Sequence, residues 1–185
     1  MLWPLKDPMV KTFLASIAAI LLIAGLVVST HTALADDVTR VTGGGTATFN
    51  ADLDGDGEID GSQFGLGVRI LGNSSANGHF QCLMAGRSDI LGLPLMAVEG
   101  KVTTGNVNSD GTATFGGLAR VNLGDGTIFS DVPITVTASA GGPGVGTLTL
   151  TVIGAFDGVP GDTIIGNGNY DLPIETVSSG HVKVN

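Results

Sequence analysis

The feature that most constrains the fold is an alternation of apolar and polar residues that recurs along most of the chain. In the clearest example, Leu148, Leu150 and Val152 alternate with three threonines. A period of two places successive side chains on opposite faces of a β-strand, whereas no window of helical length shows apolar residues spaced by three and four. The alternation therefore predicts an all-β protein.

About nine segments share this alternation. They are expected at residues 45–53, 63–70, 79–84, 96–102, 113–115, 134–138, 147–152, 164–172 and 181–184. Glycine-rich stretches such as Gly124-Asp125-Gly126 separate them, which is typical of tight turns between antiparallel strands. The expected fold is an antiparallel β-sandwich or a small closed barrel of about nine strands, since parallel crossovers need longer connections.

The first 35 residues have the pattern of a secretory signal peptide. Lys6 and Lys11 precede a long apolar run, and Ala33-Leu34-Ala35 supplies the small residues that signal peptidase requires. We expect cleavage after Ala35, which leaves residues 36–185 as a single domain with no membrane segment in its mature form. This domain is expected to be secreted or held at the cell surface. The alternative is an uncleaved membrane anchor.

The charge balance excludes several kinds of partner. Eight Lys and Arg residues against 17 Asp and Glu residues give a net charge of −9, so the chain lacks the basic surface that binds nucleic acid or anionic lipid. We expect no nucleic-acid partner, and the identity of an extracellular partner stays open. The one cysteine, Cys82, cannot form an internal disulfide. It alternates in phase with Phe80 and Met84, which predicts a buried and unreactive thiol.

The strongest local motif is the Asp-rich loop, residues 52–63, with the sequence DLDGDGEIDGSQ. Acids at loop positions 1, 3, 5 and 9 and a glycine at position 6 match the calcium loop of EF-hands. Alternate residues of a tight loop point inward, where clustered carboxylates repel one another unless a cation binds them. The cofactor expected here is calcium, and its predicted ligands are Asp52, Asp54, Asp56, Glu58 (through its carbonyl) and Asp60.

Two features separate this loop from an EF-hand. Gln63 stands at position 12, where EF-hands have a bidentate Glu, and no helical pattern flanks the loop. Loss of that ligand predicts weak binding, with a dissociation constant of about 10⁻⁴ to 10⁻³ M. The alternative is a solvated turn in which Asp and Gly serve backbone geometry alone.

The sequence contains no arrangement of residues typical of an enzyme. The mature chain would keep two histidines, His79 and His181, at outward-facing positions of different strands. Neither has the spacing of a zinc site or stands beside a nucleophile motif, and acids outside the Asp-rich loop fall in turns. We therefore expect no catalytic residues and no enzymatic activity.

Short glycine-rich motifs recur between residues 43 and 184. They are Gly43-Gly44-Gly45, Val98-Glu99-Gly100-Lys101-Val102, Ala113-Thr114-Phe115-Gly116-Gly117, Gly126 before residues 132–137, Gly141-Gly142-Pro143-Gly144 and Gly180-His181-Val182-Lys183-Val184. Their order resembles that of the post-COAP domain family of small secreted bacterial β domains. The chain departs from that pattern at Ala138-Ser139-Ala140 and at the Asp-rich loop. The resemblance implies a secreted all-β domain and no particular activity.

The function expected from these observations is that of a non-enzymatic extracellular or cell-surface domain, structural or adhesive, that calcium stabilises. One alternative is a carrier that holds a small apolar ligand inside a barrel, because the inward face is rich in small and aliphatic residues. A secreted hydrolase is a third alternative. A filled interior would argue against the carrier, and an open apolar cavity would favour it.

Overall fold

The computed structural model describes residues 38–50, 57, 60–85 and 95–185. These residues contain nine β-strands and no helix, which confirms the predicted all-β class. The strands are β1 (Thr39–Phe49), β2 (Gly61–Ile70), β3 (Ser75–Ala85), β4 (Leu95–Val107), β5 (Ala113–Asn122), β6 (Ile128–Ser139), β7 (Thr147–Val152), β8 (Tyr170–Asp171) and β9 (Glu175–Val184). All of them belong to the compact unit Asp36–Asn185.

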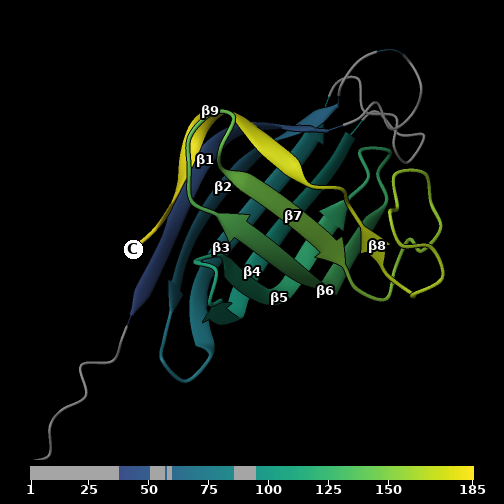
Figure 1. Ribbon diagram of the computed structural model, residues 1–185. Helices are drawn as coiled ribbons and strands as arrows, with labels where there is room; N and C mark the ends of the chain where they lie inside the picture. Colours follow the sequence, from purple (N-terminus) through teal and green to yellow (C-terminus); the bar gives the residue numbers. More distant parts are fainter. Residues whose placement is uncertain (1–37, 51–56, 58–59, 86–94) are drawn as a thin grey trace, which may run out of the picture. The chain divides into compact units, whose positions relative to one another are not determined.

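The strands form one antiparallel sheet (Figure 1). Their order is β6-β5-β4-β3-β2-β1-β9-β7-β8, so most strands pair with their neighbour in sequence. β7 also pairs with β6 over a continuous register from Ile134 with Val152 to Ser139 with Thr147. Because β7 pairs with both β6 and β9, the sheet nearly closes into a ring, and Figure 1 shows β6 and β7 crossing in front of the strands behind them.

The ring is joined least extensively between β7 and β9, which share two residue pairs. β8 adds two more pairs along the rest of β7. Farther along β9, Gly141 of the β6–β7 hairpin and Val182 exchange two backbone hydrogen bonds of 2.9 and 2.8 Å. β9 and β8 thus pair with the two ends of β7, and the hairpin contact extends the join beyond this strand.

Alternation along the strands builds a continuous apolar interior. In β7, Leu148, Leu150 and Val152 are buried between partly exposed threonines. The phase predicted for β3 is also confirmed, because Cys82 is 3% exposed and lies in the core with Phe80 and Met84. Burying an aliphatic or aromatic side chain of this size stabilises the fold by about 1.5–3 kcal/mol. The core therefore stabilises the domain without a disulfide.

Curvature comes from register shifts at four of the strand pairings: β1 with β9, β3 with β4, β4 with β5, and β5 with β6. A bulge inserts an unpaired residue and increases the local twist, which helps a sheet to curl. Next to one of these shifts, a Cβ at Gly117 would lie 1.9 Å from the carbonyl oxygen of Lys101. Glycine is therefore required where β4 and β5 approach each other.

The first strand begins earlier than predicted. β1 starts at Thr39 rather than at Gly45, and its three glycines at 43–45 pair with β2 on one side and β9 on the other. Glycine weakens a strand through its conformational freedom, but pairing along both edges compensates for that loss. Residues 51–53 of the predicted strand lie outside the described residues.

The strand predicted at residues 164–172 is wrong except at Tyr170–Asp171. The side chains of Asp157 and Asp162 accept hydrogen bonds from backbone N–H groups of this segment: Asp162 from Ile164 at 3.0 Å, and Asp157 from Gly166 at 2.7 Å and from Gly168 at 3.0 Å. A backbone donor held by a carboxylate cannot pair in a ladder. In this segment, hydrogen bonds from backbone N–H groups to Asp carboxylates take the place of pairing with another strand.

Candidate functional site

Most of the predicted calcium site lies outside the described residues, namely Asp52, Asp54, Asp56 and Glu58. Asp60 is described, and its side chain is 4% exposed just before β2. Its carbonyl oxygen accepts a hydrogen bond of 2.9 Å from the N–H of Phe49, which ties the end of β1 to the start of β2. Within the described part of the chain, no group of three or more His, Cys, Asp or Glu side chains could hold a metal ion. Calcium binding by the Asp-rich loop therefore stays a prediction.

A buried group of polar side chains, the inner polar cluster, consists of Ser62, Cys82 and Glu175. They come from β2, β3 and β9, and each is 5% exposed or less. The Ser62 hydroxyl donates a hydrogen bond of 2.5 Å to Oε2 of Glu175, a residue 113 positions away in the sequence. The sequence predicted the burial of Cys82 but not its two partners. One signal was available, because Glu175 alternates in phase with the apolar Val177.

Burial controls ionisation in the inner polar cluster. It raises the pKa of Glu175 to about 7, although the hydrogen bond from Ser62 favours the ionised form. Burial also raises the pKa of Cys82 to about 12, and negative charge on Glu175 adds to that rise. The thiol is therefore protonated at neutral pH and is a poor nucleophile. The chemistry open to this cluster is the binding and release of one proton by Glu175.

A small internal cavity lies beside the inner polar cluster. Besides Ser62, Cys82 and Glu175, its lining consists of Phe64, Phe80, Leu148, Thr149 and Leu150. Its volume of about 10 Å³ is close to the space that one water molecule needs. Pockets for small organic ligands typically measure about 300–1,000 Å³. The described interior therefore does not favour the carrier hypothesis.

Both histidines lie at exposed positions, as predicted, with His79 on β3 and His181 on β9. β2 and β1 stand between these strands in the sheet. The His79 ring lies over Gly67 of β2, with Cε1 3.2 Å from the position that a Cβ of this glycine would occupy. His79 thus covers the gap left by a glycine on the neighbouring strand, which is a packing role.

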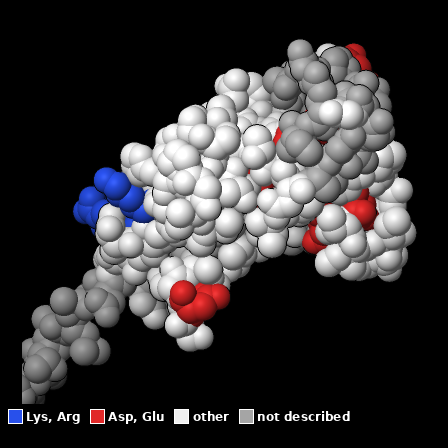
Figure 2. Space-filling model, turned by 45° about the horizontal axis from the view of Figure 1, so that its top comes forward, with Lys and Arg blue, Asp and Glu red and all other residues white. Residues whose placement is uncertain are grey.

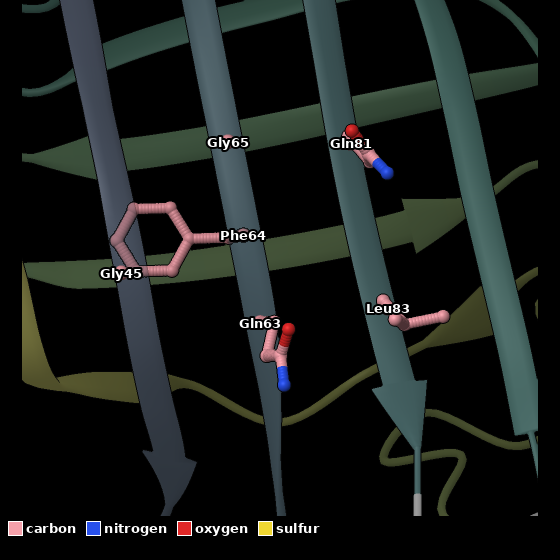
Figure 3. Close-up of a pocket in the computed structure, with 6 residues that line it drawn as sticks. All are labelled: Gly45, Gln63, Phe64, Gly65, Gln81 and Leu83. Carbon is pink, nitrogen blue, oxygen red and sulfur yellow. The ribbon is translucent and has the colours of Figure 1, made fainter.

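The outer face of β1–β3 carries a shallow depression, the glycine hollow, with a volume of about 210 Å³. It is lined by Gly45, Gln63, Phe64, Gly65, Gln81 and Leu83 (Figure 3). Figure 3 shows the side chains of Gln63, Gln81 and Leu83 on the adjacent strands β2 and β3, with no side chain at Gly65. The Phe64 ring extends toward its cross-strand partner Gly45. The hollow therefore has a backbone floor with two amides and one leucine along its sides.

A second hollow, of about 280 Å³, shares Gln63 and Leu83 with the first. The rest of its lining consists of Thr46, Ala47, Thr48, Gly61, Ser62 and Ser178. The hydroxyl oxygens of Thr46 and Ser178 lie 2.8 Å apart, so hydrogen bonding orders the two side chains. No charged residue is among the described residues that line the two hollows. Large uncharged areas are also a feature of the face in Figure 2, where Lys and Arg gather at one end.

No protein-family model, curated protein or solved structure matches this chain. The resemblance to the post-COAP domain family therefore stays a prediction from short motifs. In the part of the chain that the structure describes, no helix is long and apolar enough to cross a membrane.

Proposed function

We propose that the protein is a secreted or cell-surface domain, structural or adhesive, without enzymatic activity. The observation that carries this proposal is the pair of adjoining hollows on the outer face of β1–β3, whose described lining residues are all uncharged and in place before any partner binds. Sheet pairing on both sides fixes the strands that form it. A surface fixed in advance loses little conformational freedom on binding, which favours adhesion.

The position of the reactive side chains supports a non-enzymatic role. Cys82 and Glu175 lie in the core, where the adjoining cavity has room for about one water molecule. A catalytic group must reach its substrate within hydrogen-bonding distance. These two side chains are thus separated from the surface that a partner can reach.

Calcium forms the second part of the proposal. The Asp-rich loop connects β1 and β2. β2 contributes Gln63 and Gly65 to the glycine hollow, and β1 contributes Thr46 to the second hollow. An ion bound by carboxylates of this loop would brace the connection and hold the two strands in register. Calcium would therefore stabilise the adhesive surface rather than take part in a reaction.

An adhesion assay tests this proposal. Beads coated with the purified protein are placed on bacterial envelopes or extracellular matrix, and the fraction retained under flow is measured. The Gly65→Leu variant fills the hollow without backbone strain, because a Cβ there meets no atom within 4 Å. Gly72→Leu is the matched control, since its Cβ also has open space and lies in the β2–β3 turn. Retention that is equal for wild type, both variants and uncoated beads would contradict the proposal.

A further inference from the structure

One glycine in the lining of the glycine hollow, Gly65, has no structural need for glycine. Gly44 of β1 and Gly65 of β2 are direct cross-strand partners. Neither has a backbone conformation that excludes other residues. A Cβ at Gly65 would meet no atom within 4 Å, and one at Gly44 would meet only the Phe64 carbonyl oxygen, at 3.5 Å. Because glycine weakens a strand, this pair marks a place where a ligand can approach the backbone closely.

Gly67 provides the contrast two residues farther along β2. The imidazole of His79 covers that glycine, as described above, and so leaves no open floor. At Gly65, by contrast, the cross-strand partner on β3 is Gln81, and the structure shows open space above the glycine. Figure 3 shows Gly65 on β2 beside Gln81 on β3, with Gln63 farther along β2. The floor is therefore accessible at Gly65 but not at Gly67.

The walls of the two hollows determine which ligands fit. The exposed amides of Gln63 and Gln81 can each donate and accept hydrogen bonds, and so can the hydroxyls of Thr46 and Thr48. Leu83 adds an apolar patch that both hollows share. Since the described residues of this lining carry no charge, a charged ligand would lose hydration there and gain no ion pair from them. The matching ligand is neutral, rich in hydroxyl groups and flat on one side.

We propose that these adjoining hollows bind a short segment of a neutral polysaccharide. One sugar ring would lie with its C–H face on the glycine floor and Leu83, and its hydroxyls would bond to Gln63 and Gln81. The next ring would occupy the second hollow, beside Thr46 and Thr48. This inference rests on the proposed adhesive function and names the class of partner.

The affinity expected for one site is low. Phe64 is the aromatic residue of the lining and is 6% exposed, so the contact surface at the hollows comes mainly from glycine and a leucine rather than a broad aromatic ring. We expect a dissociation constant of about 10⁻³ M for a single site. Adhesion through many copies on one surface would multiply such weak binding through avidity.

The test is an NMR titration of the ¹⁵N-labelled purified protein. The probes are cellopentaose, xylopentaose and mannopentaose, each raised to about 10 mM, with oligogalacturonate as an anionic comparison. The side-chain amide signals of Gln63 and Gln81 should shift with at least one neutral probe and not with the anionic one. Gly65→Leu should weaken binding by at least about tenfold, because it occupies the space of the sugar ring. Gly72→Leu should bind as wild type does.

Two results would overturn the proposal: no neutral probe shifts the Gln63 and Gln81 amides, or Gly65→Leu binds a probe as tightly as wild type. Amide spectra of Gly65→Leu that match wild type away from β1–β3 establish that the variant is folded. Failure here is distinguishable from failure of the adhesive function. If no oligosaccharide binds but beads still adhere through the hollow, as shown by loss of retention with Gly65→Leu, adhesion stands and the partner is not a neutral glycan.

Discussion

Glu175 occupies a position of β9 where the alternation requires an apolar side chain, and its ionisation is therefore linked to folding. Its pKa rises from 4.5 to about 7 in the folded protein because of burial. The folded state then binds this proton more tightly than the unfolded state. The stabilisation is complete below pH 4.5 and is lost as the pH rises toward 7. The full loss amounts to about 3 kcal/mol.

Glu175→Gln should remove this pH dependence, because Gln keeps the shape and cannot ionise. We expect the free energy of unfolding of wild type to fall between pH 5 and pH 8 relative to that of the variant, as measured by urea denaturation at each pH. The difference between the two proteins cancels contributions from exposed carboxylates such as Asp110 and Asp125, whose pKa values are lowered by hydrogen bonds from backbone N–H groups. If the free energies of unfolding of the two proteins change in parallel with pH, Glu175 ionises in the folded state as it does in the unfolded state.

Cys82 should resist thiol reagents in the native protein. A pKa of about 12 instead of 9.0 lowers the thiolate fraction about a thousandfold, and the side chain is 3% exposed. We expect native Cys82 to react with a disulfide reagent at pH 8 at least about a thousandfold more slowly than the urea-unfolded protein. The rate is followed by absorbance of the released thiolate. Comparable rates in the two states would place Cys82 outside the core.

At the scale of the strands, glycines that look alike in the sequence should differ sharply in their tolerance of a side chain. Gly117→Ala places a Cβ 1.9 Å from a backbone oxygen of Lys101, and relieving that clash requires β4 and β5 to move apart. We expect it to lower the free energy of unfolding by about 2–3 kcal/mol or more. Gly65→Ala meets open space and should raise the free energy of unfolding by about 0.5 kcal/mol, because alanine loses less conformational freedom on folding. Urea denaturation of the two variants measures the contrast, and equal losses would contradict this account of β4–β5 packing.

The connection between β1 and β2 should respond to calcium. If the Asp-rich loop binds one ion with a dissociation constant near 10⁻³ M, 10 mM calcium adds about 1.4 kcal/mol to the free energy of unfolding. The melting temperature then rises by roughly 3–6 °C. Asp54→Ala and Asp56→Ala should abolish that rise and leave the fold intact. Calorimetry with and without calcium measures the rise in melting temperature. If the melting temperature of wild type does not change with calcium, the loop is a simple turn.

The strands themselves were largely predictable, because alternation is a local property. The phases of residues 63–70, 79–84 and 147–152 all agree with the observed burial. The pairing of β7 with both β6 and β9 was not predictable, since alternation carries no information about which strand lies alongside. The hydrogen bond from Ser62 to Glu175 depends on the pairing of β1 with both β2 and β9, and it was missed for the same reason.

For the whole molecule, the weakest join of the ring should open first. β7 and β9 share two residue pairs, whereas β1 and β2 share ten. Local opening follows the number of bonds that must break together. We expect the backbone amide of Val177, which donates to the Gly146 carbonyl across this join, to exchange hydrogen faster than amides in the middle of β1 and β2, as measured by NMR after transfer to D₂O. If all strand amides exchange at similar rates, β8 and the β6–β7 hairpin make the join between β7 and β9 as stable as the rest of the ring.

The contact between the two ends of the described chain has a mechanical consequence. Arg40 and Asn185 exchange backbone hydrogen bonds of 2.7 and 2.9 Å, so β1 enters the sheet where β9 leaves it. Tension applied between these two residues would load the bonds of that ladder one after another and unzip β1 from β9. Tension between one end and a ligand on β1–β3 would instead spread across many bonds at once. Under the adhesive function proposed above, the domain would withstand force best when it is tethered through a single end.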